Sequence, residues 1–220
     1  MNQELEALKR VAAEAAAEEV QDGMRVGLGT GSTVAHLLPA LAARGLRGLR
    51  CVATSDATFR TASALGLPVE EFGALDRLDV AIDGADQIAP DGWAVKGGGG
   101  AHVREKIVAA AADRFIVIAD ETKVVERISA PIPLELLGFG LAATLSAVAP
   151  AAIRPGLPRS PDGGVIADYL GEIGDPAAVA AFLSATPGVV DHGLFPPALT
   201  AEVIVAYADG RVQRRAIANV

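Results

Sequence analysis

Short apolar runs alternate with segments of helical periodicity over the first half of the chain. Residues 3–20 carry apolar side chains at helical spacing, which predicts an amphipathic helix that ends at Asp22-Gly23. Further helices are expected at 34–43, from Ser55 or Asp56 to 65, and at 101–112. The apolar runs predict strands at 24–28, 49–53, 68–69, 78–82 and 114–119. This alternation predicts an α/β fold: a Rossmann-like parallel sheet with helices on both faces.

The pattern changes near Pro131, where prolines become frequent. A strand at 164–169, a helix at 176–183 and a strand at 188–194 are expected in this part. The run 203–207, followed by Ala208-Asp209-Gly210 and then by 211–217, predicts a closing hairpin. We therefore expect a Rossmann-like main domain, 1–130 and 206–220, and a smaller α+β subdomain, 131–205.

Composition narrows the classes of partner. Of 220 residues, 51% are hydrophobic and only 4% aromatic, so the core consists mostly of Ala, Val, Leu and Ile. A net charge of −8 repels nucleic-acid phosphates, and no nucleic-acid partner is expected. A small phosphorylated ligand is still compatible with this charge. The start, MNQELEALKR, lacks a signal-peptide core, and no uncharged stretch is long enough for a membrane span. We expect a cytoplasmic protein without membrane contact, in which the single Cys51 is an inert buried thiol.

Three polar loops that contain glycine follow predicted strands, at 29–33, 83–86 and 96–100. Parallel strands bring their carboxyl ends to the same edge of a sheet, and open α/β sheets bind ligands there. We therefore expect the three loops to meet at one edge.

The first loop, in GLGTGST, resembles two nucleotide-binding motifs without satisfying either. Ser32 stands where the dinucleotide fingerprint needs glycine, and the lysine of the Walker motif is absent. The hydroxyls of Thr30, Ser32 and Thr33 at a helix N-terminus would suit a monophosphate. A glycine turn capped by Ser32 or Thr33 explains the loop equally well.

Asp83 and Asp86 place two carboxylates at a strand end. They suit acid–base chemistry or the orientation of a hydroxyl group, but an Asx turn with a solvated second acid is the simpler interpretation. His36, His102 and His192 show no metal-ligand spacing. Mg²⁺ bound by oxygen atoms alone stays open, although nothing in the sequence requires it.

The segment KGGGGAHVREK, residues 96–106, joins apolar sequence on both sides. A flexible linker would be rich in serine, so we favour a tight strand-to-helix loop whose backbone N–H groups approach a ligand. The side chain of Lys96 can reach the ligand that these N–H groups approach. Glu105 lies about one turn into the following helix and can point back toward the loop. A first-turn glutamate stabilised by the helix dipole is the ordinary alternative.

The segments GLGTGSTVAH, TSDAT, DGADQ, KGGGGAHVREK and ADETK, in this order and spacing, resemble ribose-5-phosphate isomerases of the A type. Weaker similarity at 133–135, 187–190 and 193–195 extends the resemblance over nearly the whole chain. It implies interconversion of ribose 5-phosphate and ribulose 5-phosphate in pentose phosphate metabolism, without a metal or cofactor. Scarce aromatic residues and abundant Ala and Leu suggest a buried subunit interface, so we expect a homodimer, with a homotetramer as the alternative.

Position by position, the resemblance implies roles for individual residues. Glu105 matches the catalytic base. Lys96, with loop N–H groups, would stabilise an enediolate oxyanion, and Asp83 or Asp86 would assist ring opening. We predict that the loop 29–33 holds the 5-phosphate. The implied substrate-binding residues are Thr30, Gly31, Ser32, Thr33, Asp83, Gly84, Ala85, Asp86, Lys96, Gly97, Gly98, Gly99, Lys123 and Lys9.

The chain departs from the family pattern in three places. Gln87 replaces the usual glutamate, His102-Val103 is bulkier than the usual pair, and 139–163 is rich in proline and matches poorly. Because Asp83 and Asp86 are retained, we expect activity to survive.

Two rival functions fit the sequence less well than the isomerase. A non-catalytic sugar-phosphate sensor would carry a basic DNA-binding helix pair, which is not seen before the first strand. An enzyme resembling CoA-transferases would use a glutamate as nucleophile and would need a larger cleft.

Overall fold

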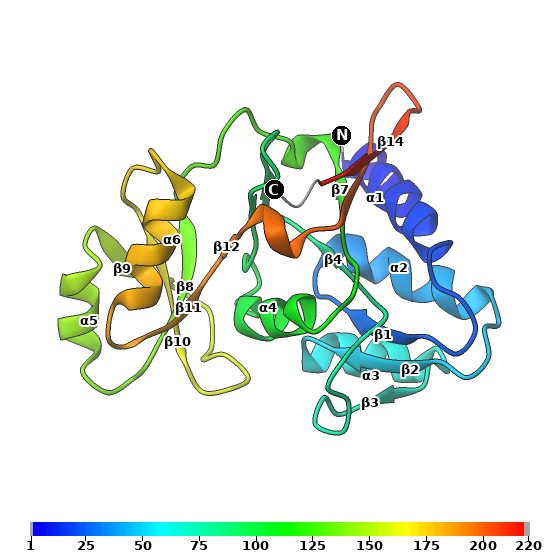
Figure 1. Ribbon diagram of the computed structural model, residues 1–220, viewed down its shortest axis with the longest axis horizontal. Helices are drawn as coiled ribbons and strands as arrows, with labels where there is room; N and C mark the ends of the chain where they lie inside the picture. The colour runs from blue at the N-terminus through cyan, green and yellow to red at the C-terminus, as the bar shows by residue number, and fades with distance from the viewer. Residues whose placement is uncertain (1, 218–220) are drawn as a thin grey trace. The chain divides into compact units, whose positions relative to one another are not determined.

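The computed structural model describes residues 2–217, which form two compact units (Figure 1). The first unit contains the residues up to Ala85, Arg104–Val124 and the residues from Pro197 onward. The second contains Asp86–Val103 and Val125–Pro196. Each unit is thus assembled from segments that are far apart in the sequence.

A seven-stranded sheet forms the centre of the first unit, in the order β14-β13-β7-β4-β1-β2-β3. Every neighbouring pair is parallel except β13 with β14. The strands are β1 (Arg25–Leu28), β2 (Arg50–Ala53), β3 (Val69–Glu70), β4 (Val80–Gly84), β7 (Phe115–Asp120), β13 (Glu202–Ala206) and β14 (Val212–Ala216). The predicted α/β class and the closing hairpin are confirmed.

Helices cover both faces of this sheet, as the alternating pattern predicts (Figure 1). Val26 and Leu28 of β1 point into the core that α1 and α2 complete. Gly27 faces the opposite side, where an added Cβ would lie 2.4 Å from Cγ1 of Val108 on α4. The helical segments are α1 (Asn2–Ala17), α2 (Ser32–Ala43), α3 (Asp56–Ala64), α4 (His102–Ala110) and the short turns η1 (Glu121–Lys123) and η2 (Pro197–Leu199).

Antiparallel pairing dominates the second unit. A four-stranded sheet has the order β11-β8-β10-β9, and a three-stranded sheet has the order β12-β6-β5. The elements are β5 (Gln87–Ile88), β6 (Ala94–Val95), β8 (Ile132–Leu136), α5 (Leu141–Ala147), β9 (Ala151–Ile153), β10 (Val165–Tyr169), α6 (Pro176–Ala185), β11 (Val189–His192) and β12 (Leu194–Phe195). Leu134, Leu136, Leu183 and Leu194 are fully buried and belong to its separate apolar core.

The two units divide the chain differently from the predicted domains, 1–130 with 206–220 and 131–205. The boundary at 205 cuts β13, which pairs along its whole length with β7 and so belongs to the first unit. Residues 86–103 fall in the second unit because β6 pairs with β12. Both differences arise from strand pairing between distant segments, which local periodicity does not report.

The expectation that all three glycine loops stand at one sheet edge is wrong for 96–100. The loop 29–33 follows β1, and 83–86 completes β4, which pairs in parallel with β1. The loop 96–100 instead follows β6, a strand of the small antiparallel sheet. In the first unit the next parallel strand, β7, leads into η1 and Lys123.

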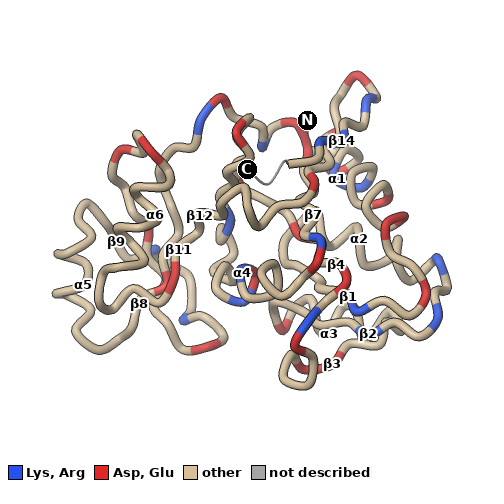
Figure 2. The backbone as a smooth tube through the Cα atoms, in the orientation of Figure 1, with Lys and Arg blue, Asp and Glu red and all other residues tan. Residues whose placement is uncertain are grey.

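Acidic and basic residues are interspersed along the chain (Figure 2). Where β7 begins, Arg114 Nη2 lies 3.0 Å from Glu19 Oε2 and 3.2 Å from Glu202 Oε2. Arg214 joins the same cluster. Burial opposes ionisation of Glu19, but hydrogen bonds from Arg214 and Arg114 outweigh it and lower the pKa of Glu19. No helix within residues 2–217 combines the length and the apolar character needed to cross a membrane.

Candidate functional site

The loop after β1 is fixed by a carboxylate from the neighbouring strand. Asp83, at the end of β4, is buried, and its Oδ1 accepts hydrogen bonds from the backbone N–H of Thr30 at 3.0 Å and of Gly84 at 2.7 Å. A Cβ at position 29 would lie 2.0 Å from this oxygen. Gly29 is therefore required by the close approach of Asp83, and the predicted meeting of 29–33 with 83–86 is confirmed.

Two threonines that the sequence did not single out also hold this loop. Thr58 Oγ1 donates to the backbone oxygen of Gly29 at 2.8 Å, and Thr54 Oγ1 lies 2.7 Å from Thr30 Oγ1. Both are buried. Thr30 therefore uses its hydroxyl and its N–H within the protein. The TSDAT segment carries these threonines, but its role could not be recognised before the strand order was known.

The start of α2 has no side-chain cap. Its N-cap residue is Gly31, with φ of 122°, and the interpretation of the loop as a turn capped by Ser32 or Thr33 is wrong. Ser32 is exposed, whereas Thr33 is buried. The exposed first turn of a helix presents backbone N–H groups and favours negative charge. The geometry of 31–33 is therefore compatible with an anion at the start of this helix.

The two lysines predicted near the phosphate have different surroundings in the first unit. Lys123 ends η1, directly after β7, where the side chain of Asp120 caps the turn through Thr122 N–H at 3.0 Å. Lys9 lies on α1, and its Nζ is 2.6 Å from Glu6 Oε1. The other oxygen of Glu6 lies 2.8 Å from His36 Nε2. Lys9 is thus already paired with a carboxylate.

Lys96 is a buried lysine in the second unit. Only 2% of the residue is exposed, and its Nζ lies 5.5 Å from the centre of the Phe195 ring. Its backbone N–H donates to the oxygen of Gly193 at 2.9 Å, beside the pairing of β6 with β12. A lysine ammonium over an aromatic face is favourable, particularly where water is excluded. The lysine before the glycines therefore points into the protein and is not a surface charge.

The four glycines after Lys96 have separate structural reasons. Gly97 has φ of 104°, and a Cβ there would lie 2.7 Å from His102 Nδ1. Gly98 approaches Asp86, whose Oδ2 accepts its N–H at 2.8 Å. Gly100 has φ of 76°, a conformation that favours glycine. Only Gly99 meets nothing within 4 Å of its Cβ position. The run is a tight loop that leads from β6 to α4, as predicted, and not a linker.

Glu105 occupies the first turn of α4 and is 5% exposed. It belongs to the first unit, together with the site positions 30–33, 83–85, Lys9 and Lys123. Asp86 and 96–99 belong to the second unit. The predicted site residues are thus contributed as two groups, each built around one glycine loop and one aspartate.

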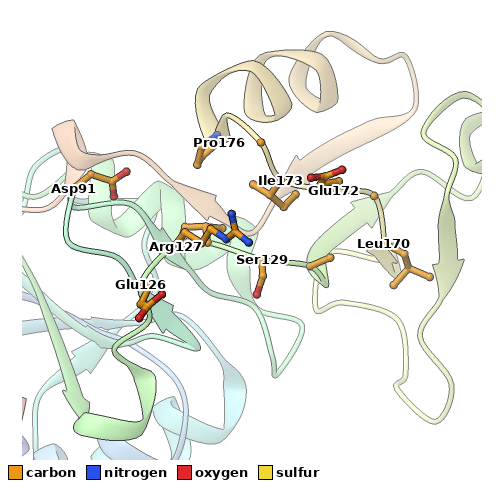
Figure 3. A pocket seen from close by; sticks show the side chains of 12 residues that line it. Asp91, Glu126, Arg127, Ser129, Leu170, Glu172, Ile173 and Pro176 are labelled. Atoms are coloured by element: carbon orange, nitrogen blue, oxygen red, sulfur yellow. The ribbon is translucent and has the colours of Figure 1, made fainter.

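Gln87, the departure from the family pattern, braces the backbone of the second unit. Its Nε2 donates to the oxygen of Ser129 at 2.8 Å, and its Oε1 accepts Ser129 N–H at 2.9 Å. A glutamate could accept the second bond but could not donate the first. The amide is therefore the better partner for this segment, which borders a cavity of about 570 Å³ (Figure 3). None of the predicted site residues lines that cavity.

Two other candidates for chemistry can be placed. Burial raises the pKa of the Cys51 thiol to about 12, so Cys51 is an inert core residue as predicted. Among residues 2–217, no group of three His, Cys, Asp or Glu side chains is arranged to hold a metal ion.

Comparison with known proteins shows which family shares this sequence and architecture. The family model of ribose 5-phosphate isomerase A (phosphoriboisomerase A) matches residues 50–210. The chain is 48% identical over 209 residues to the ribose-5-phosphate isomerase A of Nitrobacter hamburgensis, covering 87% of this chain and 90% of that protein. The crystal structure of ribose 5-phosphate isomerase A from Neisseria gonorrhoeae superposes with a TM-score of 0.92 at 31% identity, over 98% of each chain. A D-ribose-5-phosphate isomerase in complex with phospho-erythronic acid gives a TM-score of 0.91 at 31% identity, over 96% of this chain and 99% of that one. The chain therefore belongs to the ribose 5-phosphate isomerase A family.

Proposed function

We propose that this protein is an aldose–ketose isomerase that interconverts D-ribose 5-phosphate and D-ribulose 5-phosphate. Membership of an isomerase family over nearly the whole chain supports the reaction. The observation that carries the proposal is the construction of the two glycine loops. Their backbones are held in place by Asp83 and Asp86, the two carboxylates of one short segment. Such loops present N–H groups to a phosphate or an oxyanion without a side chain in the way.

The reaction requires one base that serves two adjacent carbons, and we assign it to Glu105. In the open-chain aldose, Glu105 removes the C2 proton, the C1–C2 double bond forms, and charge develops on the C1 oxygen. Return of that proton to C1, while the hydroxyl proton on O2 passes to O1, gives the ketose. A single carboxylate suffices because the proton leaves C2 and returns to C1 on the same face of the planar enediolate.

Lys96 is assigned to the oxygen that becomes negative. It is buried against Phe195, and a cation in a poorly hydrated site stabilises developing charge more strongly than one in water. The N–H groups of the adjacent glycine loop supply hydrogen bonds to the same oxygen. The two contributions act mainly in the transition state, so their loss is expected to lower turnover more than substrate affinity.

Ring opening needs a group that exchanges a proton with the sugar hydroxyl. We assign this role to Asp86, which is exposed and has one oxygen bonded to Gly98 N–H. Asp83 is buried, and its Oδ1 accepts two backbone N–H groups. Asp83 therefore suits the fixing of the loop 29–33 and the orientation of a substrate hydroxyl.

We assign the 5-phosphate to the start of α2. The uncapped helix terminus at Gly31, the exposed hydroxyl of Ser32 and the nearby end of β7 with Lys123 support this choice. Lys9 would contribute only if the phosphate shared it with Glu6. Binding energy from the phosphate, which does not react, would hold C1 and C2 in place for the chemistry.

The homodimer expected from the sequence remains part of this proposal. Support comes from large apolar side chains exposed on the second unit, where Phe139 is 94% and Leu137 52% exposed. Light scattering on the purified protein measures the oligomeric state directly.

The proposed reaction is tested with purified protein, ribose 5-phosphate and a chelator, by following formation of the ketose. Run in D₂O, an enediolate route places solvent deuterium on carbon whenever the proton on Glu105 exchanges before its return, whereas a direct hydride shift never does. Glu105→Gln is expected to lower kcat by about 10²–10⁴-fold, because it removes the base and keeps the shape of the side chain. The fold of the variant is checked by its thermal unfolding.

A wild-type protein that forms no ketose would contradict the proposed function. A Glu105→Gln variant that keeps most of its turnover would leave the reaction in place and remove Glu105 from the role of base. Deuterium bound to carbon in the product would exclude a direct hydride shift, because such a shift takes up no hydrogen from the solvent.

A further inference from the structure

A partly buried ion pair stands behind the glycine loop of the second unit. Asp168 lies on β10, directly opposite Ala152 of β9. Arg154 follows β9, two residues from Ala152, and its backbone N–H donates to the oxygen of Ile166. Arg154, Asp168 and Ile166 therefore share one face of this sheet. The side chains of Arg154 and Asp168 are only 17% and 16% exposed.

The guanidinium of Arg154 joins Asp168 to the glycine loop. Its Nε and Nη2 donate to the two oxygens of Asp168, the first at 2.8 Å. The remaining terminal nitrogen, Nη1, donates to the backbone oxygens of Gly97 and Gly98, each at 2.9 Å. Such a two-sided arrangement uses the planar fork of arginine, which lysine cannot reproduce. The carboxylates of Asp168 and Asp86 both raise the pKa of Arg154, so Arg154 keeps its positive charge.

These bonds determine how two peptide groups of the loop are turned. In a trans peptide the C=O and the following N–H point in opposite directions. With its oxygen held by Arg154, the Gly97–Gly98 peptide directs the Gly98 N–H away from Arg154, where it bonds to Asp86. The Gly98–Gly99 peptide is held by the same nitrogen and directs the Gly99 N–H likewise. Within residues 2–217 no acceptor is recorded for that Gly99 N–H, and Gly99 is exposed.

The loop needs an external restraint of this kind. Glycine populates more backbone conformations than any other residue, so a run of four glycines has little intrinsic preference for one arrangement. Ile166 provides a second contact, because its side chain lies close to Gly100. An added Cβ at Gly100 would lie 3.3 Å from Cγ1 of Ile166. One face of the β9–β10 hairpin therefore supports the loop along its length.

We propose that Arg154, held in place by Asp168, is a positioning residue for isomerisation, because it orients the Gly98–Gly99 peptide so that its N–H faces the developing enediolate oxygen. The inference deepens the proposed function and rests on it. It also gives a role to the proline-rich segment 139–163, where the family pattern is matched poorly. A displacement of about 1 Å in a catalytic group can cost about 10²-fold in rate. We therefore expect loss of the hydrogen bonds from Arg154 to the loop to affect turnover rather than affinity.

The decisive variant removes both charges, Arg154→Met with Asp168→Leu. Removing Arg154 alone would leave a partly buried, unpaired carboxylate and so lower stability as well as turnover, whereas an apolar pair keeps the hairpin packed. For the double variant we expect kcat to fall by about 10–100-fold with KM changed by less than about 3-fold. The matched control is Arg159→Met, since Arg159 Nη1 also donates to a glycine oxygen, that of Gly163 at 2.8 Å.

Amide hydrogen exchange supplies a readout that does not depend on catalysis. The N–H of Gly98 is bonded to Asp86 and that of Gly100 to the oxygen of Gly97, so both are protected while the loop keeps its shape. We expect NMR-detected exchange at these two amides to accelerate in the double variant and to stay unchanged in Arg159→Met.

Chemical rescue separates positioning from general stability. In Arg154→Ala, guanidinium at low millimolar concentration should restore part of kcat, because it can occupy the site between Asp168 and the two glycine oxygens. Arg154→Lys should retain only part of the wild-type kcat, since one ammonium cannot serve all four acceptors.

The outcomes distinguish this inference from the proposed function. If the wild type forms no ketose, the proposed function fails, and the inference fails with it, whatever the exchange data show. If the wild type is active and the double variant keeps its kcat, the inference alone is overturned, even where exchange accelerates. Lower kcat with faster exchange at Gly98, together with rescue by guanidinium, supports it.

Discussion

The loops 29–33 and 96–100 each have a backbone N–H bonded to one aspartate of the segment 83–86, but their other supports differ. In the first unit, further side-chain bonds come from Thr54 and Thr58, which follow β2, the strand next to β1. In the second unit, further side-chain bonds come from Arg154, which stands 57 residues after Gly97. The first loop is fixed by the edge of a parallel sheet, and the second by one ion pair on a separate hairpin.

Because their supports differ, substitutions in the two loops should have different consequences. A loop on the edge of a seven-stranded sheet is as stable as the sheet, so substitutions within it disturb the fold or the ligand contacts. A glycine loop held by one guanidinium can lose its orientation while the surrounding unit stays folded. We therefore expect changes around 29–33 to act on binding and stability, and changes around 96–100 to act on turnover.

Among substitutions in the two loops, the largest effect is expected for Lys96→Ala in the second-unit loop. Its charge is proposed to act on an oxyanion that exists only during the reaction, so kcat should fall by about 10²–10³-fold with little change in KM. Steady-state kinetics with ribose 5-phosphate measure both. Lys96→Met retains more of the contact with Phe195 and serves as the matched variant. A raised KM with unchanged kcat would instead identify Lys96 as a phosphate ligand.

A smaller effect, on binding, is expected for the first-unit loop. Ser32→Ala with Thr33→Val removes two hydroxyls without reducing the volume at the buried position 33. Affinity for ribose 5-phosphate and for a phosphate-bearing inhibitor should fall by similar factors, about 10–100-fold, because hydrogen bonds to charged groups are worth about 1.5–3 kcal/mol. Unphosphorylated ribose should be affected much less. Calorimetry measures the affinities.

Asp175→Ala is the control for that double variant. Asp175 caps α6 through Ala177 N–H at 2.9 Å, and its loss should cost about 0.5–2 kcal/mol of stability without changing affinity. If the Ser32 and Thr33 variant lowered kcat and left phosphate affinity intact, the assignment of the phosphate to this loop would be reversed.

Replacing one glycine of each loop by alanine should reveal the same contrast in the stability of the protein. Gly29→Ala places a Cβ against the buried carboxylate of Asp83 and should cost about 1–3 kcal/mol in the free energy of unfolding. Gly99→Ala meets nothing within 4 Å and should change that free energy by less than about 0.5 kcal/mol. Urea unfolding followed by circular dichroism compares the two. Equal losses would show that the loops are packed alike.

The smallest effect concerns the ion cluster of the first unit. The pKa of Glu19 is lowered in the folded protein, so its contribution to stability is present above its unfolded pKa, about 4.3, and is lost as the pH falls through the lower folded value. Glu19→Gln should therefore lose less stability than the wild type on acidification from pH 6 to about pH 3. The difference should be about 0.2–1 kcal/mol, as for a partly exposed pair. A parallel acid dependence in both proteins would contradict this.

Local features were readable from the sequence. The parallel sheet followed from apolar runs alternating with helical periodicity, and the cap of α3 from Ser55, whose side chain accepts Thr58 N–H. The run 96–100 was recognised as a loop before a helix because the positive φ of Gly97 and of Gly100 is a local requirement that glycine meets. Sequence also singled out the two aspartates that hold the loops, although not what they bond.

Tertiary structure decided everything that depends on pairing across long separations. The two-residue strands β5 and β6 have no periodicity of their own and exist because β12 pairs with β6. The bond from Arg154 to Gly97, the support of Gly29 by Thr58 and the brace between Gln87 and Ser129 each join distant segments. Hydrogen bonds of this kind need only one donor and one acceptor brought together by the fold, so they leave no pattern in the local sequence.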